Sequence, residues 1–354
     1  MHSLSCVADI RCASLYKGTN YKAFGQTGYS CILCGEDWWR VAFCPFILTF
    51  ASEYALKIRN MHRSGFVNII GNPNVGKSTL MNALVGERLS IITSKAQTTR
   101  HRIMGIVNGD DFQIVYSDTP GILKPNYRLQ ESMMRFVTGA LRDADVILYV
   151  TDTVEHGDEA SEAVIGEIAA CGTPVIVVIN KIDLTTAEKL DSLVDLWRGR
   201  FPDAAIVPVS ALNNFNIGGL FDTILEKLPE GEPFYPKDTL TDKTMRFFAS
   251  EIIREKIFLN YQKEIPYSVE IAIDEYKEEP TIDRISATIY VVRDSQKGII
   301  IGHRGEMLKK VGTAARLELE KFIGKKVFLQ LHVKVNENWR DSDRQLKRFG
   351  YMPE

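Results

Sequence analysis

One run of residues has the composition and spacing of a phosphate-binding loop. The pattern G-x-x-x-x-G-K-[ST] is matched by Gly71, Asn72, Pro73, Asn74, Val75, Gly76, Lys77 and Ser78. Thr79 follows directly and is included in the predicted site. Glycine lets the backbone curl so that amide N–H groups face phosphate oxygens, and the N-terminus of a following helix adds positive partial charge. In this pattern the lysine neutralises the β- and γ-phosphates and the hydroxyl binds Mg²⁺. We therefore predict a nucleotide site, with Lys77 in a catalytic role and Mg²⁺ on Ser78.

The alternative interpretation of this run is a chance glycine-rich turn. A strand-like run, Phe66–Ile70, stands directly before it, and a helix-like run, Ser78–Val85, follows. The phosphate-binding pattern needs this context of strand, loop and helix, so the flanking residues favour a nucleotide site.

A second run, Asn180-Lys181-Ile182-Asp183, could choose the base of the nucleotide. It follows the strand-like run Val175–Ile179 and is expected at the carboxyl edge of a sheet, where ligands bind. A carboxylate there can accept hydrogen bonds from N1–H and the exocyclic amine of guanine, and adenine offers no such pair. Asp183 is thus predicted to select guanine, and Asn180 to brace the loop. Ser210-Ala211-Leu212 are expected to present a backbone N–H to guanine O6.

The run Asp118-Thr119-Pro120-Gly121 ends another strand-like run, Gln113–Ser117. A carboxylate in this position can hold Mg²⁺ through water, and the amide of Gly121 can meet the γ-phosphate. The alternative is an ordinary turn, because Asp, Pro and Gly are common turn residues. The place directly after a strand favours a role for Asp118 in metal binding and for Gly121 in catalysis.

The last part of the chain contains a second glycine motif, of a kind that binds RNA. Gly302-His303-Arg304-Gly305 is a G-x-x-G loop, in which two glycines let a single-stranded backbone pass close while the two cations face phosphates. Lys309 and Lys310 follow it. The alternative is a plain helix-entry turn beside a solvated lysine face. The strand-like run before the loop and the helix- and strand-like runs after it favour RNA binding.

Short apolar runs rich in β-branched residues alternate with longer amphipathic runs between Phe66 and Leu228. This order predicts a doubly wound, mostly parallel α/β sheet with its ligand at the carboxyl edge. Besides the strands named above, we predict strands at Val146–Thr151, Ala205–Val209 and His101–Val107, and helices that include Ala160–Cys171 and Thr186–Arg200. His101–Val107 is expected to pair with Gln113–Ser117 through Asn108-Gly109, which is a strong hairpin signal.

A segment with several prolines separates this first domain from a second one. We assign residues 61–230 to the first domain, 231–241 to a linker, and 242–354 to the second domain with a C-terminal tail. The second domain is predicted to hold, besides the glycine loop, helices at Lys243–Leu259 and Glu306–Ile323 and strands at Ser268–Glu275, Asp283–Arg293 and Val327–Val335.

Residues 1–60 differ from the rest of the chain. They hold five of the six cysteines and show no sustained hydrophobic period. We predict an extraneous or disordered extension before Met61. The alternative is a targeting or metal-binding appendage, since Cys31 and Cys34 have C-x-x-C spacing, but no second pair or nearby histidine completes a zinc site.

Bulk properties exclude few classes of function. The formal net charge of −2 argues against a protein coated with basic charge, although it permits a local basic patch for RNA. No run reaches about 18 apolar residues, so we expect no transmembrane helix.

One further run narrows the family to which these motifs point. Lys95-Ala96-Gln97-Thr98-Thr99-Arg100-His101-Arg102, followed by Asp118-Thr119-Pro120-Gly121, resembles the Era family of ribosome-assembly GTPases, and the resemblance extends from about Phe66 to the C-terminus. It implies that Thr99 joins Mg²⁺ only when γ-phosphate is present and so acts in catalysis; the residues alone leave Thr98 and Thr99 equal. In the second domain, the predicted order of helix, strand, strand, loop, helix and strand resembles the type II KH fold, whose additional short helix can only lie in Ser295–Ile301.

The reaction is expected to be slow. Phosphoryl transfer to water needs positioning and charge neutralisation, and Ras-like proteins orient the water with a glutamine after the D-x-x-G glycine. Here that position is Ile122, an apolar residue as in the Era family. We therefore predict slow GTP hydrolysis that another group or a partner accelerates. Arg100 and Arg102 lie near the predicted switch and are interpreted as solvated charges or RNA contacts.

By the resemblance, the chain is expected to bind 16S ribosomal RNA near its 3′ end and to assist assembly of the 30S subunit, as a cytoplasmic monomer. Family members also associate loosely with membranes, so the resemblance further implies a peripheral contact of this chain with the inner face of the cell membrane. Two other functions fit parts of the pattern. One is an ATP-dependent kinase of small molecules, which Asp183 argues against. The other is a passive RNA-binding module with a purely structural nucleotide site.

Overall fold

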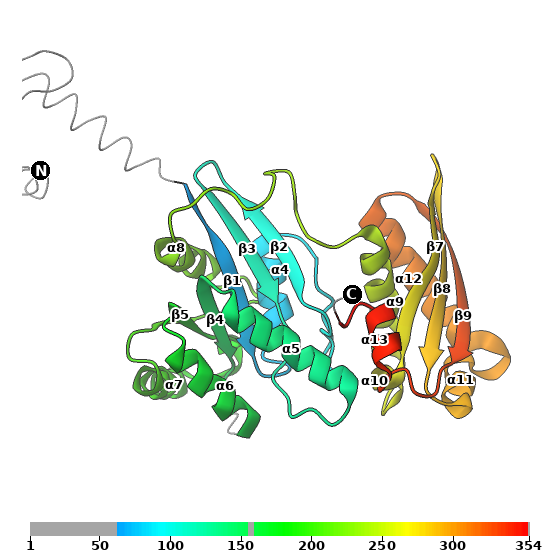
Figure 1. The fold of residues 1–354 in the computed structure, drawn as a ribbon, viewed down its shortest axis with the longest axis horizontal. Coiled ribbons are helices and arrows are strands. Elements are labelled where there is room, and N and C mark those ends of the chain that lie inside the picture. Colours follow the sequence, from blue (N-terminus) through cyan, green and yellow to red (C-terminus); the bar gives the residue numbers. More distant parts are fainter. Residues whose placement is uncertain (1–61, 155–158, 353–354) are drawn as a thin grey trace, which may run out of the picture. The chain divides into compact units, whose positions relative to one another are not determined.

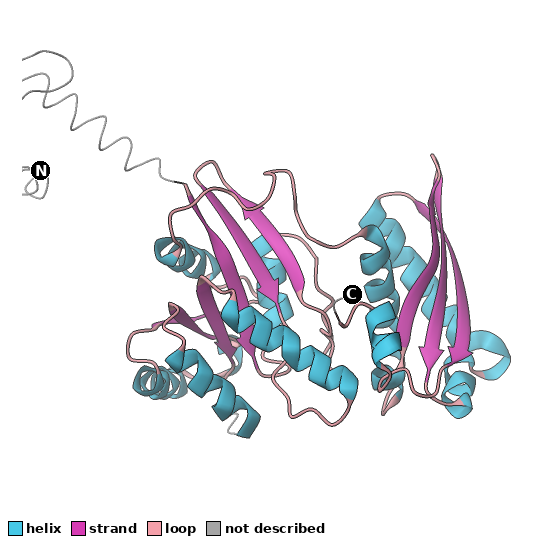
Figure 2. Cartoon of the chain, in the orientation of Figure 1, coloured by secondary structure: helices cyan, strands magenta, loops and turns pink. Residues whose placement is uncertain are grey.

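The computed structural model describes residues 62–154 and 159–352, which form two β-sheets with helices packed against them. Figure 1 labels the elements along the chain, and Figure 2 distinguishes helices from strands. The predicted features of residues 1–60, including Cys31 and Cys34, lie outside the described residues. No helix within the described ranges is long and apolar enough to cross a membrane.

The first sheet of the described residues has six strands in the order β2-β3-β1-β4-β5-β6, and all neighbouring pairs except β2–β3 are parallel. The strands are β1 (Arg63–Gly71), β2 (Ile103–Asn108), β3 (Phe112–Asp118), β4 (Val146–Thr151), β5 (Val175–Ile179) and β6 (Ala205–Pro208). In the β2–β3 hairpin, Asn108 pairs with Gln113 and the Gly109 N–H donates to the Phe112 carbonyl at 2.9 Å. The predicted mostly parallel sheet and its hairpin are confirmed.

Side chains of this sheet alternate between two faces, and each face has its own core. In β4, Val146, Leu148 and Val150 pack in one core, whereas Ile147 and Tyr149 pack in the other. The first core includes residues of α4 (Lys77–Val85) and α8 (Ile217–Lys227), and the second includes residues of α5 (Arg128–Arg142), α6 (Glu159–Ala170) and α7 (Ala187–Arg200). Helices therefore cover both faces of the sheet, which is the doubly wound arrangement (Figure 2).

The second sheet has three strands in the order β7-β8-β9, with β7 antiparallel and β9 parallel to β8. Its elements in chain order are α9 (Met245–Asn260), α10 (Ile265–Ser268), β7 (Glu270–Glu278), β8 (Ile282–Val291), α11 (Asp294–Ile301), the 3₁₀ turn η2 (His303–Gly305), α12 (Glu306–Ile323), β9 (Lys326–Val335) and α13 (Asp343–Arg348). Residues of α9, α11 and α12 pack in one core with residues of β8. The short helix expected in Ser295–Ile301 is present as α11.

The segment 231–241 is fixed along the edge of the first sheet. The N–H groups of Phe234 and Tyr235 donate to Oε1 of Gln113 at 2.7 and 2.9 Å, and the Ile106 N–H donates to the Leu240 carbonyl at 2.8 Å. Gln113 belongs to β3 and Ile106 to β2. The predicted linker is thus bound to β2 and β3.

Candidate nucleotide and RNA sites

The predicted phosphate-binding loop connects β1 to α4, as its motif requires. Gly76, directly before α4, has a φ of 98°, and a Cβ added to it would lie 2.3 Å from Nδ2 of Asn180. Both the backbone conformation and the close approach exclude a side chain at this position. The last glycine of the motif is therefore dictated by the fold of the loop.

Lys77 bends back over this loop. Its Nζ donates to the carbonyls of Gly71 and Asn72 at 3.0 and 2.9 Å, and its side chain is buried. Burial lowers the pKa of Lys77 from 10.5 to about 8, and the nearby Asp118 carboxylate opposes this shift. An anion beside a buried ammonium favours its charged form, so a phosphate in this loop would stabilise the Lys77 cation.

Three oxygen-bearing side chains meet beside the loop. Ser78 Oγ lies 2.7 Å from Oδ2 of Asp118 and 2.8 Å from Oγ1 of Thr99, and Thr99 Oγ1 lies 3.3 Å from the same carboxylate oxygen. Burial raises the pKa of Asp118, while the Ser78 hydroxyl and the Lys77 ammonium oppose that rise. Mg²⁺ prefers oxygen ligands, and a cation here would offset the cost of burying the carboxylate. The three residues predicted as metal ligands are thus brought together and fit the ion.

The two threonines that the residues alone left equal have different environments. Thr98 Oγ1 bonds within its own loop, at 2.6 Å from Thr93 Oγ1 and 2.7 Å from the Lys95 carbonyl. Thr99 instead faces Ser78 and Asp118. Geometry therefore favours Thr99 over Thr98 as the residue next to the metal position.

The predicted base-selecting residues lie at the carboxyl end of β5. Asn180 donates from Nδ2 to the Val75 carbonyl at 2.9 Å, and its Oδ1 accepts from the Ala211 N–H at 3.0 Å. Asp183 is exposed in the 3₁₀ turn η1 (Ile182–Leu184), and its Oδ1 accepts from Ser210 Oγ at 2.5 Å. These bonds join the phosphate loop, η1 and the segment 210–212, whose Leu212 is 79% exposed at the surface.

The structure adds Asp152, which sequence reasoning did not single out. Asp152 follows β4, is buried, and accepts a hydrogen bond of 2.8 Å from Lys181 Nζ. Lys181 lines the same cavity as the phosphate loop. The sequence position of Asp152 could have indicated its role, because an aspartate directly after a strand of a parallel sheet lies at the ligand-binding edge.

The run Thr119–Gly121 packs against the phosphate loop. Thr119 Oγ1 donates to the Ile69 carbonyl at 2.7 Å, and a Cβ added to Gly121 would lie 2.8 Å from Cα of Pro73. Pro120 is buried as well. Ile122 is only 2% exposed and packs in the core that contains Tyr149. The side chain after Gly121 is therefore part of the interior and cannot orient a water molecule.

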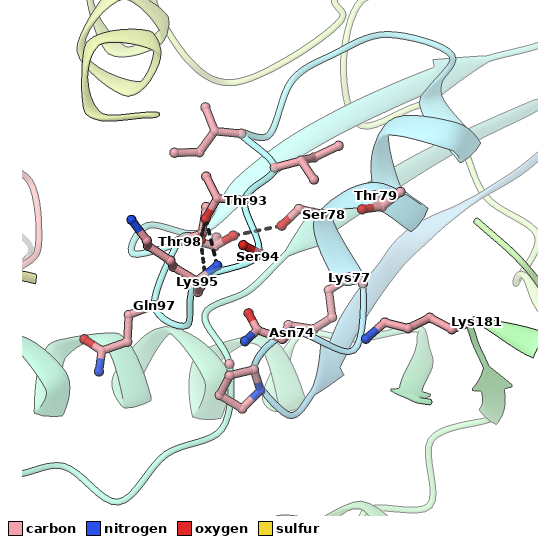
Figure 3. A pocket seen from close by; sticks show the side chains of 16 residues that line it. Asn74, Lys77, Ser78, Thr79, Thr93, Ser94, Lys95, Gln97, Thr98 and Lys181 are labelled. Carbon is pink, nitrogen blue, oxygen red and sulfur yellow. Dashed lines mark hydrogen bonds between the residues drawn. The ribbon is translucent and has the colours of Figure 1, made fainter. Parts of the chain in front are cut away.

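A cavity of about 370 Å³ lies between the phosphate loop and the segment that precedes Thr99. Figure 3 shows Asn74, Lys77 and Ser78 on one side of it, with Thr93, Lys95 and Thr98 on another and Lys181 nearby. The predicted nucleotide-binding residues that line this cavity are Pro73, Asn74, Gly76, Lys77, Ser78, Thr79, Gly121 and Lys181, together with Thr99.

The predicted RNA-binding residues surround the start of α12. Gly302 has a φ of 72°, and a Cβ added to it would lie 2.7 Å from Cβ of Met307, so the loop needs glycine there. His303 and Arg304 are exposed in η2, directly before Gly305. Lys309 and Lys310 are exposed in the first turns of α12 and line a shallow surface pocket. Four basic side chains thus lie along one short stretch of surface.

The interpretation of Arg100 and Arg102 as solvated charges or RNA contacts is wrong. Arg100 is 1% exposed, and Arg102 is held by Ser117 Oγ at 2.6 Å and by Asp143 Oδ2 at 2.5 Å. Trp339 packs in the interior, and its Nε1 donates to the Ser268 carbonyl at 3.2 Å.

Comparisons with known proteins match both parts of the chain. A family profile described as 50S ribosome-binding GTPase matches residues 66–181, and one described as KH domain matches residues 264–340. GTPase Era of Syntrophus aciditrophicus (strain SB) is 46% identical over 293 residues, which are 82% of this chain and 96% of that protein. The chloroplastic GTPase ERA1 of Zea mays is 44% identical over 296 residues, covering 82% of this chain and 71% of that protein.

Two solved structures are each similar to most of the chain. One is Era in complex with MgGDPNP and nucleotides 1506–1542 of 16S ribosomal RNA, with 42% identity, a TM-score of 0.79, and coverage of 82% of this chain and 100% of that chain. The other is an Aquifex aeolicus Era variant bound to GDP and AlF4⁻, with the same identity, TM-score and coverage.

Proposed function

Because the chain belongs to the Era family of GTPases, we propose that it binds 16S ribosomal RNA near its 3′ end under the control of GTP, and so assists assembly of the 30S subunit. The chain is a P-loop GTPase domain followed by a KH domain, and it hydrolyses GTP to GDP and phosphate. One observation carries the RNA proposal: four exposed basic side chains lie within a G-x-x-G loop and directly after it, on the same chain as the GTP site. The related Era structure contains both MgGDPNP and 16S nucleotides.

We assign the residue roles at the nucleotide site from their geometry. The segment from Gly71 to Thr79 holds the phosphates, and the Lys77 ammonium neutralises the β- and γ-phosphates. Asp183 accepts the two guanine hydrogen bonds and Asn180 braces its loop. We also assign Thr119, Pro120, Lys181, Ser210, Ala211 and Leu212 to nucleotide binding. The bonds of Asn180 to Val75 and Ala211 support this assignment, because they fix the base-selecting loop relative to the phosphate loop.

Hydrolysis depends on how these groups hold charge. Ser78, Thr99 and Asp118 would hold Mg²⁺, which supplies positive charge beside the β- and γ-phosphates when it is bound. The Gly121 amide meets the γ-phosphate, and Thr99 responds to its presence. Since Ile122 is buried, its side chain contributes nothing to orienting the attacking water. We therefore propose slow intrinsic turnover that RNA or a protein partner accelerates.

In the KH domain we propose that Gly302 and Gly305 let a single RNA strand approach, while His303, Arg304, Lys309 and Lys310 contact its phosphates. Exposure of all four basic side chains supports this role.

Other properties stay predictions. They are the domain limits 61–230, 231–241 and 242–354, the monomeric state, the cytoplasmic location and the loose contact with the inner face of the cell membrane. Light scattering after size-exclusion chromatography measures the oligomeric state. Cell fractionation with antibody detection distinguishes soluble from membrane-bound protein.

The proposal is tested by RNA affinity in three nucleotide states. The full chain is titrated with a fragment of 16S ribosomal RNA from the 3′ end, in the presence of GDP, of a non-hydrolysable GTP analogue, or of no nucleotide, at one salt concentration. We expect the tightest binding with the analogue. Replacing Gly302 and Gly305 by Asp should abolish RNA binding but leave GTP affinity unchanged. Equal RNA affinity in all three states would refute control by GTP on this RNA.

A further inference from the structure

Arg100 directly follows Thr99 in the sequence, but its side chain contacts residues of the KH domain. Its Nη1 donates to the Val269 carbonyl at 2.7 Å and to Oε2 of Glu270 at 3.3 Å, and its Nη2 donates to the Pro266 carbonyl at 3.0 Å. The guanidinium also lies within about 6 Å of the rings of Phe258 and Trp339. Every one of these partners belongs to the second domain, so this arginine of the GTPase domain is fixed by the KH domain.

A second contact fixes the other end of the same loop. Lys95 Nζ donates to the carbonyls of Phe258 and Tyr261, at the C-terminal end of α9. Free carbonyls at a helix C-terminus carry negative partial charge and favour a cation. The loop 95–100, which carries Thr99, is therefore held at both ends by the segment 258–270 of the KH domain.

Tyr351, near the C-terminus, packs against the residues around Arg100. Tyr351 is buried, its hydroxyl donates to Glu270 Oε2 at 2.7 Å, and its ring stacks on His101 at 4.2 Å between centroids. Oε2 of Glu270 thus accepts hydrogen bonds from both Arg100 and Tyr351. The Tyr351 ring also packs on His101, the residue after Arg100.

At its other side, Thr99 meets the nucleotide site, because its Oγ1 lies 2.8 Å from Ser78 Oγ. Since consecutive Cα atoms are about 3.8 Å apart, any shift of the Arg100 backbone also shifts Thr99, and the contacts of the guanidinium with residues 266–270 oppose such a shift. We propose that Arg100 is a positioning residue for Thr99, so that the KH domain forms part of the sensor for the γ-phosphate. This inference rests on the proposed role of Thr99 beside Mg²⁺. Coupling between two binding sites is reciprocal. If a ligand of the KH domain moves residues 266–270 and thereby changes the affinity for GTP by some factor, GTP changes the affinity for that ligand by the same factor.

The test uses the full chain and two nucleotides, without RNA. Affinities for a fluorescent non-hydrolysable GTP analogue and for fluorescent GDP are measured at saturating Mg²⁺. In Arg100→Gln we expect the analogue to bind about tenfold more weakly while GDP affinity changes by less than about twofold, because only the γ-phosphate state uses Thr99. Arg100→Lys should recover part of the loss, since an ammonium can still donate to one of the carbonyls.

Arg88→Gln is the matched control. Arg88 also pairs with the KH domain, through Glu255 and Glu318, but it precedes the loop that carries Thr99. We expect this variant to keep the wild-type ratio of analogue to GDP affinity. Equal losses for both nucleotides in Arg100→Gln, or the same change of ratio in Arg88→Gln, would reduce Arg100 to a structural contact and overturn the inference.

A milder variant keeps the inference testable if Arg100→Gln fails to fold. Tyr351→Phe removes only the hydroxyl that bonds to Glu270, and we expect a smaller shift of the same ratio; an unchanged ratio overturns the inference. Failure of the proposed function has a different signature, namely RNA affinity that is independent of nucleotide in the wild-type chain.

Discussion

At the scale of the single residue, the carboxylate of Asp183 is assigned the choice of base. Asparagine has the same shape, but it turns one acceptor into a donor. We expect Asp183→Asn to weaken GTP binding about 100-fold, because a hydrogen bond to a charged group contributes roughly 1.5–3 kcal/mol. The variant should instead bind xanthosine triphosphate, whose C2 carbonyl can accept from the new amide. Competition of GTP, xanthosine triphosphate and ATP against a fluorescent nucleotide measures both changes.

Asp191→Asn provides the control, since Asp191 is an exposed aspartate on α7. It should leave the preference for GTP intact. A preference for GTP that survives in Asp183→Asn would mean that another residue selects the base, and better binding of ATP than GTP by the wild type would revive the kinase alternative.

Thr98 and Thr99 allow a matched test of the metal position. We expect Thr99→Ala to weaken the Mg²⁺-dependent binding of a GTP analogue by about tenfold, because one charge-assisted contact is lost. GDP binding should be nearly unchanged. Thr98→Ala removes a hydroxyl that bonds only within its loop and should preserve the Mg²⁺ dependence. Titration of Mg²⁺ against analogue affinity compares the two variants, and identical curves would contradict the assignment of Thr99.

Residues of local motifs could be predicted from the sequence, whereas residues held by distant partners could not. The phosphate loop is contiguous, so its spacing and the strand-like and helix-like runs that flank it place Lys77 and Ser78 next to a ligand. Arg100 is different, because its partners follow it by about 170 positions along the chain. Nothing in its immediate neighbours predicts burial, and a loop arginine is usually exposed. Asp152 lies between these cases, because its position after β4 was visible but its partner Lys181 was not.

At the scale of the element, Tyr261 connects the end of α9 to the end of α11. Its hydroxyl donates to the Ile300 carbonyl at 2.6 Å, and burial raises its pKa from 10 to about 12. Since the folded pKa exceeds the unfolded value, the folded protein keeps this proton between pH 10 and 12 while the unfolded chain loses it. The contribution of Tyr261 to the free energy of unfolding is therefore complete below pH 10 and falls as pH rises toward 12.

We expect Tyr261→Phe to lower the free energy of unfolding by about 1 kcal/mol at pH 8, the usual value of one buried hydrogen bond. The difference between wild type and variant should narrow above pH 10, because only the wild type loses this contribution. Urea unfolding at pH 8 and at pH 10.8 measures the two differences. A gap that widens at the higher pH would show that the phenol ionises in the folded state more readily than in the unfolded chain.

The local pattern placed some helices correctly, whereas at least one short helix was not predicted at all. The helix predicted at Glu306–Ile323 has the observed bounds of α12. α13 was not predicted, because its six residues are too few to show a period. It depends on packing instead, since its Leu346 is buried with Trp339 and with Leu129 of α5. Short helices of this kind form through tertiary contacts that a local pattern cannot contain.

At the scale of the whole molecule, charge limits how RNA can be held. The formal net charge is −2, so no general positive field draws a polyanion to the surface. Affinity for RNA must then come from a local cluster of cations, and the described surface offers one around η2 and the start of α12. Each phosphate contact of a single strand contributes about 0.7 to the slope of log affinity against log salt.

Lys309→Ala combined with Lys310→Ala should therefore lower that slope by about 1.4 and weaken binding of the 16S fragment, while GTP affinity stays unchanged. Titrations of RNA at several salt concentrations give the slope. Lys189→Ala combined with Arg198→Ala removes the same charge from exposed positions of α7, which separates a local contact from an effect of net charge. If both double variants reduced the slope equally, the RNA would respond to total charge, and the surface around the G-x-x-G loop would lose its assignment as the site of contact.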